Sequence, residues 1–258
     1  MLFRPANPLS HRLARLSFIA ACVAAVVVAS CGPLHRYLDV GVDVVISLFR
    51  YGFYVAAGAV ALALATIVPT RPGERRRGFV AAVLALIIGL CAAASPFTLF
   101  LQAVGAPRIN DITTDTLDPP PMLVTLEMRR AEAVTAPAYP GQAFADLQHT
   151  AYPDIAPIMI DVPPSDAFKR VDAVAMSMGW DVVARAPNDG RLEAVATTRW
   201  FGFHDDIVVR IHPDGAGSRI DIRSKSRVGR SDLGVNARRI RAFAKMLNES
   251  VEAQTAER

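Results

Sequence analysis

Cysteine is scarce in this chain of 258 residues and is absent after Cys91. The other two cysteines, Cys22 and Cys31, also lie in the apolar N-terminal part. The C-terminal part therefore has neither a disulfide framework nor a thiolate metal site. A folded region of about 150 residues buries enough surface to be stable without covalent cross-links.

Acidic residues are scarce in the N-terminal part. Residues 1–105 contain nine arginines and three acids, a local balance of +6, whereas residues 106–258 contain 19 basic and 21 acidic residues, or −2. The chain is 52% hydrophobic, and this excess of apolar residues lies in its first 105 residues. The net charge of +4 thus belongs to the flanks of a membrane anchor and does not indicate nucleic-acid binding.

The local motifs of common enzyme classes are missing as well. The sequence contains no GxSxG, HExxH, P-loop or Rossmann fingerprint, so hydrolases, proteases, NTPases and dehydrogenases of those classes lack support. His204, Asp205 and Asp206 suggest a metal site, with His149 or His212 as further ligands, but their spacing fits no zinc or calcium pattern. We therefore expect no metal and no cofactor.

Three apolar stretches, 16–31, 51–68 and 79–101, stand out in the N-terminal part. A helix that crosses the hydrocarbon core needs about 20 residues. The third stretch meets this length, the second meets it at the margin, and the first is short unless its neighbours extend it. Residues 1–104 are predicted to form a membrane anchor of about three transmembrane helices, with the lipid bilayer as partner.

Arginine placement predicts the orientation of this anchor, because cytoplasmic loops retain Lys and Arg. One group precedes the first stretch and the other lies between the second and third: Arg4, Arg12, Arg15, Arg71, Arg75, Arg76 and Arg77. We expect a bacterial inner (plasma) membrane protein with a cytoplasmic N-terminus and a periplasmic C-terminal domain. An alternative is that residues 1–30 are a lipoprotein signal cleaved before Cys31, which leaves that domain on the same side.

The C-terminal part divides into an arm and a regular domain. Proline and aspartate are frequent over 105–156, which predicts an irregular arm packed on the domain. Residues 157–258 show the order β-α-β-β-β-β-α, with apolar residues alternating in the strands and at helical spacing before Gly179 and from Ile240. Ser231 or Asp232 is placed to cap the last helix. The predicted fold class is α+β, a two-layer antiparallel sheet with two helices on one face.

The segment 223–236 concentrates basic and hydroxyl side chains before the last helix. A turn rich in Gly and Ser that leads into a helix N-terminus suits phosphate, sulfate or carboxylate. The candidate anion-binding residues are Arg223, Ser224, Ser226, Arg227, Arg230, Ser231 and Asn236. Alternatively, these arginines pair with the domain's own acids, such as Asp111, Asp115, Asp205 and Asp206.

The arm carries a second polar group, formed by Asp111, Thr113, Thr114 and Asp115. Two carboxylates and two hydroxyls in five residues can hold a hard cation or act as an acid and base pair. The same residue types also form side-chain turns that only fold the backbone. Both interpretations stay open at this point.

Several long strings resemble the domain-of-unknown-function family number fourteen ninety-nine. They are INDITTDTLDPP (109–120), YPDI (152–155), MGW (178–180), RLEAVATTRWFGFHDDIVVRI (191–211) and DIRSKSRVGRSDLGVNARRIRAF (221–243), with LFRYGFY at 48–54 in the helical front end. The resemblance covers about 140 residues and implies bacterial membrane-tethered or exported domains without an agreed activity. Asn110 stands where the family usually has His, which argues against a catalytic role there.

Together these features predict a non-enzymatic envelope module that binds an anionic ligand or an acidic envelope protein through residues 223–236. The alternative is an uncharacterised hydrolase that uses Asp111, Asp115 or Asp205.

Overall fold

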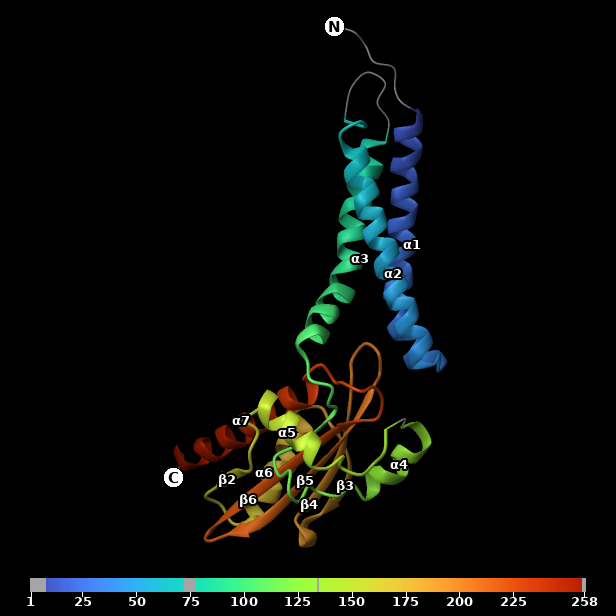
Figure 1. The fold of residues 1–258 in the computed structure, drawn as a ribbon. Helices are drawn as coiled ribbons and strands as arrows, with labels where there is room; N and C mark the ends of the chain where they lie inside the picture. Colours follow the sequence, from blue (N-terminus) through green and yellow to red (C-terminus); the bar gives the residue numbers. More distant parts are fainter. Residues whose placement is uncertain (1–7, 72–77, 134, 257–258) are drawn as a thin grey trace. The chain divides into compact units, whose positions relative to one another are not determined.

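The structure is a computed structural model that describes residues 8–71, 78–133 and 135–256 (Figure 1). Contacts divide the chain into two compact units. Unit 1 comprises Met1–Val104 with Trp200–Gly202, and unit 2 comprises Gly105–Arg199 with Phe203–Arg258.

Unit 1 contains three long helices, α1 (Pro8–Leu38), α2 (Val42–Ile67) and α3 (Phe79–Gly105). All three are long and apolar enough to cross a membrane. The prediction of three apolar helices is confirmed, and each helix begins earlier or ends later than its apolar stretch. The first is not short, because its 31 residues extend about 46 Å, more than the hydrocarbon core of about 30 Å requires.

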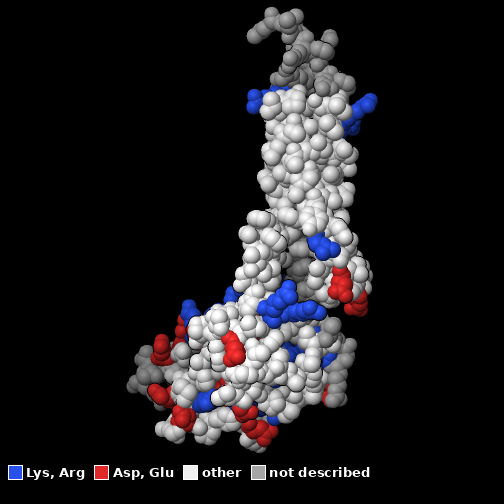
Figure 2. All heavy atoms as spheres, in the orientation of Figure 1, with Lys and Arg blue, Asp and Glu red and all other residues white. Residues whose placement is uncertain are grey.

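Small residues let these helices approach one another. Ala21, Ala59, Ala63 and Ala85 form one buried cluster. A Cβ added at Gly52 would lie 2.7 Å from Cγ2 of Val28. Larger apolar side chains point outward, as membrane helices require, because lipid is as apolar as leucine. In Figure 2 the visible helix surface is white over most of its length, with charged side chains gathered toward the ends.

Unit 2 is built on a six-stranded antiparallel sheet in the order β1-β6-β5-β4-β3, with β2 also paired to β6. The strands are β1 (Asp111–Thr113), β2 (Ile158–Ile160), β3 (Asp181–Ala186), β4 (Arg191–Thr197), β5 (His204–Asp214) and β6 (Gly217–Ser226). The two short strands share one edge of β6: β1 pairs with 223–225 and β2 with 218–220. The antiparallel sheet is as predicted, whereas β1 is an additional strand contributed by the arm.

Helices α6 (Pro164–Ser177) and α7 (Val235–Ala256) cover one face of the sheet, as predicted. The apolar core between them and the strands includes Leu192, Ile207 and Ile222. The side chain of Asp232 caps the start of α7 (Val235), because its carboxylate accepts the backbone N–H of Asn236 at 2.6 Å. A short 3-10 turn, η1 (Pro187–Asp189), connects β3 to β4.

The arm is more regular than its composition indicated. Besides β1 it contains α4 (Val124–Glu132) and α5 (Gln142–Ala151), which Figure 1 draws in green and yellow-green. The prolines at 119–121, 137 and 140 lie between these elements, and Pro153 follows α5. Proline therefore divides the arm into short elements and does not prevent them.

Candidate functional site

The second face of the sheet, opposite α6 and α7, is built from charged side chains. Side chains alternate between the two faces of a strand. In β6, Ile220 and Ile222 lie in the apolar core. The alternate residues Asp221, Arg223 and Lys225 therefore face the other side of the sheet. We call this set the ionic layer: Asp111, Arg129, Glu193, Asp206, Asp221, Arg223, Lys225 and Arg227, each at most 3% exposed.

Asp111 of β1 is the first anchor of the ionic layer. Its carboxylate accepts hydrogen bonds from Nε and Nη2 of Arg223, both at 2.9 Å, and from Nζ of Lys225 at 2.6 Å. Arg223 also donates to the carbonyls of Pro120 and Pro137. Burial lowers the pKa of Lys225, and the neighbouring Asp111 opposes that shift. The bidentate Arg223 pair leaves this guanidinium committed to groups within the domain.

Asp206 of β5 is the second anchor, shared by two arginines. Nη1 of Arg129 lies 2.6 Å from its Oδ2, and Nη2 of Arg227 lies 2.7 Å from its Oδ1. Arg129 also donates to the carbonyl of Ser226 at 2.9 Å. Because Arg129 belongs to α4, this pair fastens the arm to the sheet.

Glu193 of β4 caps α4 from outside the helix. Its carboxylate accepts the backbone N–H groups of Leu123, Val124 and Thr125, and the hydroxyl of Thr125 at 2.8 Å. A carboxylate is favoured at a helix N-terminus, where backbone N–H groups lack helical partners. Sequence reasoning missed this role, although an acid in the middle of a buried strand is the signal that could have revealed it.

Most of the predicted anion-binding residues are buried inside unit 2 and bond to other groups there. The buried members are Arg223, Ser224, Ser226, Arg227 and Asn236. The hydroxyl of Ser224 donates to Oδ1 of Asn236 at 2.7 Å, and Nδ2 of Asn236 donates to the carbonyl of Asn110. Arg223 and Arg227 follow the alternative interpretation, pairing with the domain's own acids. Of the predicted arginines, Arg230 is the one on the surface.

The polar arm candidates also serve structural roles. Thr114 accepts the N–H of Ile222 at 2.9 Å, which continues the pairing of β1 with β6. Asp115 accepts the N–H groups of Leu117 and Asp118 and pairs with Arg219 at 2.7 Å. Within residues 8–71, 78–133 and 135–256, no group of three or more His, Cys, Asp or Glu could hold a metal ion.

A surface patch forms where the linker after α3 meets the loop between β6 and α7. The hydroxyl of Ser231 donates to the carbonyl of Pro107 at 2.8 Å, and Nδ2 of Asn110 donates to the carbonyl of Gly229 at 2.6 Å. We call the exposed arginines of this region, Arg108, Arg230 and Arg238, the linker–loop patch. Nη1 of Arg238 donates to the carbonyl of Leu233 at 3.0 Å, so it is attached to the same loop.

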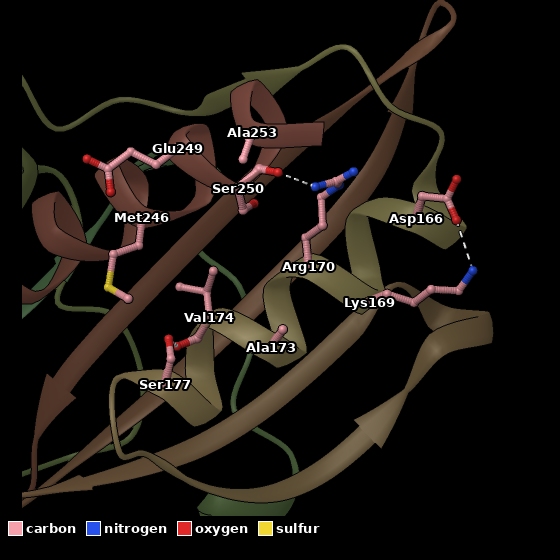
Figure 3. Close-up of a pocket in the computed structure, with 10 residues that line it drawn as sticks. All are labelled: Asp166, Lys169, Arg170, Ala173, Val174, Ser177, Met246, Glu249, Ser250 and Ala253. Carbon is pink, nitrogen blue, oxygen red and sulfur yellow. Dashed lines mark hydrogen bonds and ion pairs between the residues drawn. The ribbon is translucent and has the colours of Figure 1, made fainter. Parts of the chain in front are cut away.

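A separate open groove of 880 Å³ lies between α6 and α7 (Figure 3). Val174 and Met246 contribute apolar surface to it. Asp166 pairs with Lys169 at 2.9 Å along α6, and Arg170 reaches across to the carbonyl of Ser250 on α7. None of the predicted site residues lines this groove.

Comparison with models of protein families gives a match. The family model described as a protein of unknown function, DUF1499, matches residues 111–247, a little more than half of the chain. A search of curated proteins found no match. The matched region starts at the first residue of β1 and ends within α7, so it contains the whole sheet and the ionic layer, while the three apolar helices lie outside it. The chain therefore belongs to DUF1499, the family that its sequence strings resemble.

Proposed function

We propose that this protein is a non-catalytic module of the bacterial cell envelope that binds an anionic ligand or acidic partner at the linker–loop patch. The observation that carries this proposal concerns the nine basic residues between 219 and 245. Seven of them form ion pairs within unit 2: Arg219, Arg223, Lys225, Arg227, Arg239, Arg241 and Lys245. In the part of the chain that the structure describes, Arg230 and Arg238 form no ion pair, and Arg108 beside them forms none either.

The alternative of a hydrolase has less support from the geometry. A catalytic carboxylate must reach a substrate atom. Asp111 is buried and holds Arg223 and Lys225, and Asp205 is buried and pairs with Arg239 at 2.6 Å. Asp115 is engaged by two backbone N–H groups and by Arg219. All three carboxylates thus have structural roles, which favours a binding module.

The arginine distribution supports a periplasmic location for unit 2. Arg12 and Arg15 lie in the first turns of α1, and Arg71 follows α2. Arg4, Arg75, Arg76 and Arg77, which the prediction also used, lie outside the described residues. With both groups in the cytoplasm, three crossings deliver the chain after α3 to the other side.

Two experiments test the proposal. Alkaline phosphatase fused after residue 258 is expected to be active in cells, because that enzyme folds only after export, whereas a fluorescent protein that matures only in the cytosol should stay dark there. The reverse pattern contradicts the location.

Anion binding is tested on the full chain in uncharged detergent micelles with pyrophosphate as probe. At ten times Kd, pyrophosphate should raise Tm by about 3 °C. The variant R108Q/R230Q/R238Q should lose this shift. The control K169Q/R185Q/K245Q, which removes three cations elsewhere on unit 2, should keep it. The absence of a shift in the wild-type chain contradicts anion binding.

A further inference from the structure

We infer that the linker–loop patch binds the phosphate headgroups of acidic phospholipids in the leaflet where α3 ends. This inference rests on the proposed function and names its ligand. Three features of the patch support this inference: the hydrogen bonds that hold it, the short chain distance between Arg108 and the end of α3, and its positive charge.

The patch is held in place by the backbone around it. Besides the two hydrogen bonds of Ser231 and Asn110, the N–H of Asp232 donates to the carbonyl of Ile109 at 3.3 Å. Arg108 therefore lies between two linker residues that are bonded to the loop, while Arg230 precedes Ser231 directly. Arg238 is joined to the same loop through the carbonyl of Leu233. Since the loop is already ordered, binding needs to immobilise only the three side chains.

The covalent chain keeps Arg108 close to the membrane. Two residues, Ala106 and Pro107, separate it from Gly105, the last residue of α3, so the distance between the Cα atoms of Gly105 and Arg108 is at most about 10 Å. Apolar side chains of α3 stay exposed up to Val104, which is 72% exposed. Headgroup layers add about 5–7 Å on each side of the hydrocarbon core. Whatever the orientation of unit 2, Arg108 remains within reach of that layer.

The positive charge of the patch exceeds the negative charge of its loop. The carboxylate of Asp232 accepts the N–H groups of Gly234 and Asn236 and offsets at most one of the three arginine charges, while Asp154 pairs with Arg241 at 2.5 Å. Guanidinium groups bind phosphate oxygens through two parallel N–H bonds. Each basic residue near an anionic membrane surface contributes about a fivefold increase in affinity. Three arginines held around one loop, from the linker, the loop itself and the first turn of α7, therefore suit a surface of phospholipid headgroups.

The test uses the full chain in nanodiscs of phosphatidylcholine alone or of phosphatidylcholine mixed with phosphatidylglycerol. The measurement is amide hydrogen exchange over residues 227–234. We expect exchange to be slower by about fivefold or more in the anionic discs, and this protection should disappear at high salt. R108Q/R230Q/R238Q should show no protection, and K169Q/R185Q/K245Q should behave like the wild-type chain.

Other outcomes contradict phospholipid binding, and they show whether the proposed anion-binding function fails with it. Equal exchange in both kinds of disc overturns the lipid inference. If pyrophosphate then slows exchange in neutral discs, anion binding stands and the ligand is soluble. If only polyglutamate slows it, the partner is an acidic protein. If none of these probes has an effect, both the inference and the proposed function are wrong.

Discussion

The side-chain amide of Gln148 pairs with the backbone of Thr113 as a neighbouring strand would. Its Oε1 accepts the N–H of Thr113 at 3.0 Å, and its Nε2 donates to the carbonyl of the same residue at 2.7 Å. β1 forms the outer end of the sheet, and α5 brings Gln148 against its open edge. An unpaired strand edge is a template for aggregation. The Gln148 amide occupies the N–H and the carbonyl of Thr113, so another strand cannot pair with them.

Replacement of Gln148 by Leu should destabilise unit 2 by about 2 kcal/mol, because two buried backbone groups lose their partners. Thermal unfolding of the full chain in detergent, followed by tryptophan fluorescence, measures the loss. Exchange of the Thr113 amide should accelerate in the same variant. The control is Gln142→Leu on the same helix, where the glutamine is exposed and donates to Asp146. A variant at 148 that is as stable as the control contradicts the role of this amide.

Replacement of Asp206 by Asn should cost about 3–5 kcal/mol, because two buried guanidinium groups lose their shared counter-charge. Unfolding of the detergent-solubilised chain in urea gives the difference. Asp154→Asn removes an acid from a pair whose side chains are 42% and 53% exposed, so it should cost less than about 1 kcal/mol. Similar losses in the two variants contradict the importance of burial at Asp206.

Replacement of Glu193 by Gln should release α4 from the sheet. The neutral amide offers one acceptor oxygen in place of two, and it loses the charge that favours the helix N-terminus. We expect amide exchange over residues 123–130 to accelerate, while exchange over β5 and β6 stays slow. Glu249→Gln, at an exposed position on α7, serves as the control. Uniform acceleration across the sheet would show general unfolding and would contradict a local capping role.

Ionisation of Tyr139 should lower the stability of unit 2 at alkaline pH. Burial, together with the nearby charge of Asp111, raises the pKa of Tyr139 to about 12, and the guanidinium of Arg223 lies 5.7 Å from its ring. The folded-state pKa is above the unfolded value of about 10, so this contribution is complete below pH 10 and is lost as the pH rises to about 12. The loss should amount to about 2 kcal/mol in the wild-type chain.

Tyr139→Phe should lack this alkaline step, since it cannot ionise. At neutral pH the variant should be at least as stable as the wild-type chain, because the hydroxyl has no hydrogen-bond partner among the residues described. Urea unfolding of both chains between pH 8 and pH 12 gives the comparison. Parallel curves over that range contradict the raised pKa.

Elements with strong local patterns were predictable from the sequence. The three apolar helices, five of the strands and the cap at Asp232 follow from hydropathy, alternation and turn residues. β1, α4 and α5 were not predicted, because each is short and depends on distant groups. Glu193 caps α4 from about 70 residues away, and Gln148 supports β1 from another helix.

The basic segment 223–236 shows how far the candidate site could be predicted from the sequence. Its local charge indicates an anion site, but the acids that neutralise Arg223 and Arg227 come from β1 and β5. Asp111 and Arg223 are 112 positions apart in the chain. Sequence alone left both interpretations open, because no local pattern states which acid reaches which arginine. The exposed Arg108 joined the patch only when the structure placed the linker beside the loop.

The pairing of β1 with β6 has a consequence for biosynthesis. β1 follows the membrane helices directly and leaves the ribosome long before β6 does. Until Arg223 and Lys225 emerge, the Asp111 carboxylate has no counter-charge, and such distant pairings form slowly. β1 is therefore synthesised early but pairs only after β6 has been synthesised. A nascent chain truncated before residue 223 should expose that first strand to chaperones and proteases.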